Sequence, residues 1–221
     1  MRRSPLRRGV LAVAMGTTMT GAGAMVAPAQ TTAAPGPTAS IAKVAVAKKR
    51  LNVRSGRSAV VRGAVRPAAS GFVASLQVRR NGRWYTIDRD RTGTSGRYVV
   101  RDRRRAPMSL PVRVHVRGAA DRTRRRLGRL NVYRWALASW YGPGFYGRRT
   151  GCGGTLGAGE LGVAHKTLPC GTKVTLRHRG RRVRVPVIDR GPYVGAREYD
   201  LTSATAQRIG FRGHGAILAT R

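Results

Sequence analysis

Between residues 138 and 202 the chain reads ASWYGPGFYGRRTGCGGTL (138–156), GVAHKTLPCGTKV (162–174) and VPVIDRGPYVGAREYDLT (185–202). Each block combines glycines and aromatic residues with single polar residues, and strand-like runs join the blocks. Loops on a rigid scaffold commonly carry binding and catalytic side chains. We therefore expect these blocks to form turns that present a few side chains to one cleft.

The last part of the chain, residues 136–221, is predicted to be mostly β with one short helix. Thr202 is suited to cap that helix, which would cover residues 203–209 and stop at Gly210. The predicted strands of this part are residues 163–165, 173–177, 182–188 and 216–219.

Residues 43–134 show short runs in which polar and apolar residues alternate, at spacings of about ten residues. Asn81-Gly82 is a strong tight-hairpin signal. The pattern predicts an Ig-like antiparallel β-sandwich, with a short link at residues 132–136 leading into the last part. The predicted strands are residues 58–65, 74–79, 84–87, 96–100 and 112–116.

Positive charge dominates the composition. The chain has 44 Lys and Arg against 8 Asp and Glu, a net charge of +36, and residues 43–134 hold 26 of the basic residues against four Asp. Such a field attracts polyanions. In a cytosolic protein the first candidate partner would be nucleic acid, whereas an exported protein would meet anionic wall polymers or phospholipid headgroups. The alternative is a spacer whose charge only confers solubility.

The amino terminus determines which of these partners we expect. Residues 1–29 have a basic head, the weakly apolar run Val10 to Val26, and Ala27-Pro28-Ala29 at the end, which is typical of a secretory signal peptide. The alternative is a transmembrane anchor, but glycines and threonines interrupt the run. We expect a secreted, cell-wall-associated protein without stable membrane insertion or a specific nucleic-acid partner. Residues 30–42 are predicted to be a disordered linker.

The chain has two cysteines, Cys152 and Cys170, and both lie in the quoted blocks. In an exported protein two cysteines at this separation most simply form a disulfide. Zinc is the alternative, with His165 or His178 as further ligands, although no CxxC or HxxxH spacing supports it. We expect the disulfide, and no metal or cofactor.

The quoted blocks resemble the rare lipoprotein A (RlpA) family, whose better-known members are septal ring lytic transglycosylases. The resemblance rests on ASWYGPGF (138–145), AHKTLP (164–169), DRGPY (189–193) and YDLT (199–202), in this order. It implies a six-stranded double-psi β-barrel over residues 136–221, a fold also found in the first domain of expansins, with a groove for peptidoglycan glycan strands. The fold class is then all-β, with the sandwich preceding the barrel.

Asp189 and Asp200 are the carboxylates inside the resembling blocks. Glycoside cleavage needs a proton donor at the leaving oxygen and commonly a second carboxylate. By resemblance, Asp189 matches the family's DRGP aspartate and Asp200 the aspartate required in expansins. We assign Asp189 as the acid and then the base, supported by Asp200. An ion pair with Arg190 would instead make Asp189 purely structural.

Aromatic and polar neighbours complete the predicted site. Trp140, Tyr141 and Tyr193 offer ring faces suited to sugars, with ordinary packing as the alternative. His165 would orient a carboxylate or bind sugar, or else make a structural hydrogen bond. Arg190 is assigned to substrate binding.

One position departs from the family pattern. Active members carry a Glu in the loop before His165, and that position falls at Gly154, while the nearest acid is Glu160. Loss of a catalytic carboxyl can lower activity by orders of magnitude. The sequence therefore supports a lytic transglycosylase and, alternatively, a non-catalytic expansin-like wall-binding module. An inhibitor or signalling barrel is a third possibility.

Overall fold

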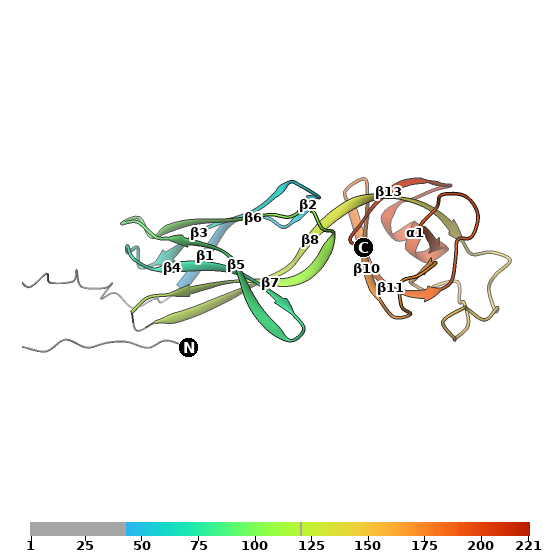
Figure 1. The fold of residues 1–221 in the computed structure, drawn as a ribbon, viewed down its shortest axis with the longest axis horizontal. Coiled ribbons are helices and arrows are strands. Elements are labelled where there is room, and N and C mark those ends of the chain that lie inside the picture. The colour runs from blue at the N-terminus through green and yellow to red at the C-terminus, as the bar shows by residue number, and fades with distance from the viewer. Residues whose placement is uncertain (1–42, 120) are drawn as a thin grey trace, which may run out of the picture. The chain divides into compact units, whose positions relative to one another are not determined.

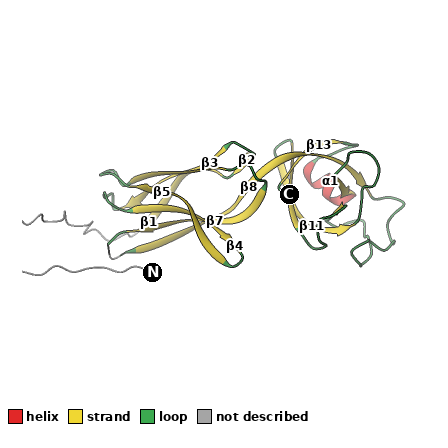
Figure 2. Ribbon diagram, in the orientation of Figure 1, coloured by secondary structure: helices red, strands yellow, loops and turns green. Residues whose placement is uncertain are grey.

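A computed structural model describes residues 43–119 and 121–221. The predicted signal peptide and the linker at residues 30–42 lie outside this range. The described residues are mostly strand, with a single α-helix near the carboxyl end (Figures 1 and 2). No helix in the described ranges is long and apolar enough to cross a membrane.

The first part of the described chain forms two groups of strands. In one, β1, β3 and β6 pair antiparallel in the order β1-β3-β6; in the other, β5, β4, β7 and β8 pair antiparallel in that order, and β2 lies parallel to β8. The bounds are β1 Lys43–Arg50, β2 Asn52–Arg54, β3 Ser58–Arg66, β4 Val73–Arg80, β5 Arg83–Arg91, β6 Arg97–Arg103, β7 Met108–Arg117 and β8 Arg122–Tyr141.

Alternation of side chains explains how these strands build a core. In β3 every second residue is buried, including Val61 and Val65, while Arg62 and Arg66 face solvent. Leu76, Tyr98 and Leu130 are fully buried in the same cluster. The five strand runs predicted here coincide with β3 to β7 to within a few residues, apart from the longer β5 and β7. The Ig-like assignment itself remains a prediction.

The Asn81-Gly82 hairpin is confirmed between β4 and β5. Both residues have positive φ, 47° and 77°, as the tight turns that match strand twist require.

The residues predicted to link the two parts, 132–136, are extended and belong to the unbroken strand β8. Val132 pairs with Met108 of β7 on one side and Val53 of β2 on the other. Ala136 pairs with Ile217, in the strand β13 near the carboxyl end. Since neighbouring strands satisfy the backbone groups of this segment, it stays extended. The domain boundary near residue 135 remains a prediction.

The carboxyl-terminal part adds five strands and the helix to the end of β8. The strands pair in the order β12-β9-β11-β10-β13-β8, and β8 also pairs in parallel with β12. The bounds are β9 Val163–His165, β10 Lys173–His178, β11 Arg181–Asp189, β12 Tyr199–Thr202, α1 Ser203–Ile209 and β13 Gly215–Ala219.

The predicted helix caps are confirmed. The Thr202 side chain accepts a hydrogen bond from the Thr205 backbone nitrogen, and Gly210 ends the helix in the left-handed conformation at φ 66°. Ile209 and Ala206 of α1 are buried with Val187 of β11 and Leu201 of β12. The helix thus covers one face of the strands and leaves their loop ends to form the site.

Candidate functional site

Strand pairing brings the two predicted catalytic aspartates together. Asp189 ends β11, Asp200 lies in β12, and β9 runs between these strands. Ala164 of β9 is in register with Asp189 on one side and with Asp200 on the other. Two strand spacings separate the aspartates, about 10 Å between their Cα atoms.

Backbone N–H groups hold the carboxylate of Asp189. Its Oδ1 accepts hydrogen bonds from the backbone nitrogens of Gly151, at 2.6 Å, and Arg190, at 2.8 Å. The side chain of Arg190 makes no ion pair with it in the described structure. The interpretation of Asp189 as half of a structural ion pair is therefore wrong.

The guanidinium of Arg190 serves the neighbouring loop instead. It donates to the carbonyl oxygens of His165, at 3.0 Å, and Leu168, at 2.7 Å, and to the sulfur of Cys170, at 2.8 Å. With these donors engaged, Arg190 fixes the loop between β9 and β10. Its predicted role in substrate binding gains no support from this placement.

Asp200 lies in a more enclosed environment. Its Oδ1 accepts from the Ser139 hydroxyl at 2.8 Å, and Arg197 Nη1 donates to the same hydroxyl at 2.8 Å. Burial raises the pKa of Asp200, partly offset by the Ser139 hydrogen bond and the Arg197 charge, while the charge of Asp189 raises it further. Asp200 is therefore suited to hold a proton.

Tyr141 faces both aspartates. Burial, and then the negative charge of Asp189, raise the pKa of its hydroxyl, with smaller contributions from Asp200 and Glu160. The hydroxyl oxygen is buried and has no partner within hydrogen-bond geometry among the described residues. It lies close enough to the Asp189 carboxylate to be influenced by it, without a well-formed bond. Burial and the neighbouring carboxylate of Asp189 both favour the neutral, protonated phenol.

His165 makes a structural hydrogen bond. Its Nδ1 accepts from the backbone nitrogens of Thr167 and Leu168, both at 3.1 Å, so the neutral ring carries its proton on Nε2. The ring packs against Tyr199, with centroids 5.0 Å apart, and burial lowers its pKa. These contacts favour the structural alternative over an acid–base role.

The predicted aromatic residues separate into two groups. Tyr193, which is 75% exposed, follows Asp189 closely in the chain, and Phe145, half exposed, packs edge-on against Tyr141. Trp140 alternates with Tyr141 along β8 and so faces the other side. It lines a pocket of about 320 Å³ beside α1. The structure does not bring Trp140 together with the aspartates.

The disulfide between Cys152 and Cys170 is confirmed, with Cα atoms 5.6 Å apart. It joins the loop after β8, which carries Gly151, to the loop that Arg190 holds. The backbone nitrogen of Cys152 also donates to the Ile188 carbonyl at 3.3 Å. Together these contacts place the Gly151 N–H at the Asp189 carboxylate.

Gly154 lies in a tight exposed turn. Gly153 and Gly154 have φ of 82° and 85°, and Thr150 closes the turn through its backbone nitrogen, which donates to the Gly154 carbonyl at 3.1 Å. A residue with a side chain is strained at such φ values. The loop is therefore built for glycine at the position where the resembling family carries Glu.

Three contributors to the site were missed by sequence reasoning. The Ser139 hydroxyl donates to Asp200, Arg197 donates to that hydroxyl, and the Gly151 backbone nitrogen donates to Asp189. Ser139 and Arg197 lie within or beside the quoted blocks, so their positions were a usable signal. The Gly151 donor could not be recognised from the sequence, because it is a backbone N–H group that nearly every residue type carries.

Comparisons with known proteins match the carboxyl-terminal part of the chain. A family model described as "Lytic transglycolase" matches residues 135–219. The "Probable endolytic peptidoglycan transglycosylase RlpA" of Synechocystis is 48% identical over 81 residues, 36% of this chain and 25% of the relative. "Endolytic peptidoglycan transglycosylase RlpA" of Campylobacter jejuni is 49% identical over 75 residues, 33% of this chain and 27% of the relative. The Aquifex aeolicus protein is 44% identical over 82 residues, 36% of each chain.

The carboxyl-terminal region therefore matches an RlpA-like double-psi β-barrel domain. The chain spans only about a quarter to a third of the length of these relatives. A solved structure, Streptomyces papain inhibitor (SPI), covers 40% of this chain at 23% identity with a TM-score of 0.32, which is too low to support a conclusion.

Proposed function

We propose that this protein is secreted, binds the glycan strands of peptidoglycan and cleaves them as a lytic transglycosylase. The observation that carries the proposal is the placement of Asp189 and Asp200 on either side of Ala164, within the domain that resembles these enzymes. The disulfide supports an extracytoplasmic location, because disulfides persist in oxidising compartments.

The environments of the two carboxyl groups suggest distinct roles. Asp200, with its raised pKa, donates a proton to the bridging oxygen as the bond to C1 of muramic acid breaks. Asp189 remains a carboxylate on two backbone donors and stabilises positive charge at C1. The C6 hydroxyl of muramic acid then attacks C1 and returns its proton to Asp200. This leaves a 1,6-anhydro end and consumes no water.

This assignment exchanges the roles expected from the sequence, where Asp189 was the acid. The exchange rests on two observations: burial raises the pKa of Asp200, and two backbone N–H groups already donate to the Asp189 carboxylate. Tyr141 would donate a hydrogen bond to the sugar, and Tyr193 and Phe145 would stack against sugar faces. Trp140 has no part in this step.

A second candidate is a non-catalytic, expansin-like protein that binds or loosens the wall. The observation that favours it is the glycine turn at residues 153–154, whose positive φ at Gly154 would strain the backbone of a Glu although a side chain there would meet open space. Both candidates place the glycan strand at the same residues. They differ only in whether a bond breaks.

The basic strands offer a second contact with the wall. Arg113 pairs with Arg126, and Arg117 with Arg122, directly across β7 and β8. Like charges at such positions are destabilising, and burial together with neighbouring arginines lowers the pKa of Arg113. An anionic wall polymer would neutralise this arginine ladder. We therefore propose that the basic strands also bind an anionic wall polymer. The alternative is that these strands are a spacer whose charge only confers solubility.

Digestion of purified peptidoglycan tests the proposal. The whole protein and the Asp200→Asn variant are incubated with peptidoglycan, with and without its stem peptides, and soluble products are analysed by mass spectrometry. Co-sedimentation with insoluble wall is scored in the same samples. Anhydro products from the wild type alone support the enzyme. Wall binding by both proteins without products supports the expansin-like alternative.

A further inference from the structure

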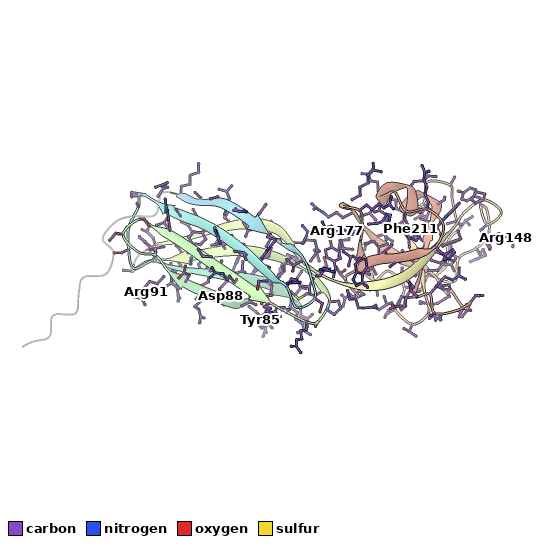
Figure 3. The ribbon with its side chains drawn as sticks, turned by 90° about the horizontal axis from the view of Figure 1, so that it is seen from above. Tyr85, Asp88, Arg91, Arg148, Arg177 and Phe211 are labelled. Carbon is purple, nitrogen blue, oxygen red and sulfur yellow. A yellow bond between two sulfur atoms is a disulfide. The ribbon has the colours of Figure 1, made fainter. Side chains whose placement is uncertain are left out.

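A cationic pocket lies at the end of α1, away from the aspartates. It has a volume of about 600 Å³ and is lined by Arg179, Arg181 and Arg212 together with His178 and His214. Arg181 begins β11 and Asp189 ends it, so Arg181 lies about 25 Å along the strand from Asp189. Phe211, which also lines the pocket, is labelled in Figure 3.

The charges of this pocket are not used by the protein itself. None of the three guanidinium groups makes a hydrogen bond or an ion pair with another described residue, and no Asp or Glu lines the pocket. By contrast, Arg134 pairs with Glu198, and Arg190 and Arg197 are hydrogen-bonded. The helix end is also satisfied, since Gly210 and Phe211 donate to the carbonyls of Gln207 and Ala206.

One buried polar atom of the pocket lacks a partner. His178 packs its ring edge-on against Phe211, with centroids 5.4 Å apart, and its Nδ1 is buried without a hydrogen bond among the described residues. A buried polar nitrogen without a partner is unfavourable. The His178 side chain thus forms part of the pocket wall.

An apolar pocket adjoins the cationic one. Phe211 and Arg212 line both this pocket and the pocket of about 320 Å³ that contains Trp140. The two pockets therefore adjoin at these residues, with positive charge in one and an indole, 41% exposed, in the other. The Trp140 ring offers a flat apolar face, and arginine forks match phosphate oxygens.

We propose that these two adjoining pockets bind a phosphorylated sugar unit, with the phosphate among Arg179, Arg181 and Arg212 and the sugar ring on Trp140. The three arginines lie away from Asp189, and Trp140 faces the opposite side of β8 from Tyr141, so the proposal does not depend on glycan cleavage. Such a unit can belong to a glycan phosphate of the wall or to a phospholipid headgroup. Both present a phosphate next to a hydroxylated carbon framework.

Calorimetric titration of the whole protein tests the proposal. Glucose 6-phosphate, inorganic phosphate and glucose are titrated separately, and vesicles containing phosphatidylglycerol are tested by co-sedimentation. We expect glucose 6-phosphate to bind more tightly than inorganic phosphate, and glucose to bind least. If the protein binds the vesicles and glucose 6-phosphate displaces it from them, the phosphate of the natural ligand is assigned to a lipid headgroup. If the protein does not bind the vesicles, the phosphate is assigned to a glycan phosphate.

Matched variants separate a site from general charge. Arg181→Gln/Arg212→Gln is expected to weaken glucose 6-phosphate binding at least about tenfold. Arg91→Gln/Arg97→Gln, which removes the same charge from exposed positions elsewhere, is expected to leave it unchanged. Trp140→Ala should weaken glucose 6-phosphate but not inorganic phosphate. Thermal unfolding of each variant verifies its fold.

The proposal is overturned if glucose 6-phosphate does not bind or if both double variants weaken it equally. It is also overturned if inorganic phosphate binds as tightly as the sugar phosphate, because Trp140 would then have no role. A higher affinity for a single-stranded oligonucleotide that depends on the same arginines would assign the pocket to another partner. Peptidoglycan cleavage is measured in parallel, so that a loss of sugar-phosphate binding can be distinguished from a loss of cleavage.

Discussion

Asp189 and Asp200 are aligned with the same residue, Ala164, from the two strands that flank β9. The strand order therefore brings together two carboxyl groups that lie eleven residues apart in the chain. Their surroundings differ: backbone amides hold Asp189, whereas burial and the Ser139 hydroxyl surround Asp200. Two carboxyl groups in different environments can divide the roles of acid and charge stabiliser.

Removal of either carboxyl should abolish cleavage while leaving wall binding intact. We expect Asp189→Asn and Asp200→Asn each to lower the rate of anhydro-product release by about a thousandfold or more. Asp88→Asn, on β5 of the basic strands, is the control and should retain full activity. Release rates that match the control in both variants would remove these residues from the mechanism.

Stability should depend on pH through Asp200. Because burial raises the pKa of Asp200 in the folded state, the folded protein binds more protons than the unfolded chain at pH values between the ordinary pKa near 3.8 and the raised folded pKa. The contribution of Asp200 to the free energy of unfolding is therefore lost as pH rises through the folded pKa.

Chemical denaturation checks this sign. Asp200→Asn keeps the oxygen that accepts from Ser139, so it should be more stable than the wild type at pH 7 and equal to it below pH 3. A wild type that exceeds the variant at pH 7 would contradict the assignment of burial as the dominant cause.

The disulfide should support both stability and the site. Closing a loop with a separation of 18 residues stabilises the fold by about 3 kcal/mol. Cys152→Ser/Cys170→Ser should lose about this much in the free energy of unfolding, and its cleavage rate should fall because the Gly151 donor to Asp189 is no longer held. Activity that survives unchanged at a temperature where the variant is folded would show that the loop holds its shape without the bond.

The arginine ladder should bind polyanions in a salt-dependent way. Arg113→Gln/Arg126→Gln removes one like-charged pair across β7 and β8. We expect weaker co-sedimentation with walls that carry anionic polymers at low salt and little difference at 1 M salt, where charges are screened beyond about 3 Å. Arg113 also donates to Gln77 at 2.8 Å and stacks over the Trp84 ring, so thermal unfolding of the variant verifies its fold. Walls stripped of those polymers provide the control. Equal binding to intact and stripped walls would favour a spacer.

Much of this architecture could be predicted from local patterns. The alternation of Val and Arg in β3, the Asn81-Gly82 turn and the caps of α1 are each encoded within a few residues. The unbroken β8 was missed because its extension at residues 132–136 depends on β2 and β13, which are distant in sequence.

Some residues of the candidate site could likewise be predicted from the sequence, and others could not. Asp189 and Asp200 were found because they lie in recognisable blocks. The role of Arg190 was not, because its guanidinium is directed to carbonyls of the β9–β10 loop. The separation of Trp140 from Tyr141 follows from strand alternation, which becomes visible only once β8 is known to extend through both residues.

The most direct test of the central claim is mass spectrometry of peptidoglycan incubated with the wild type and with Asp200→Asn at equal wall occupancy. The proposed mechanism predicts 1,6-anhydromuramic products from the wild type and none above background from the variant. Products in equal amounts from both proteins, or none from a wild type that sediments fully with the wall, would contradict it.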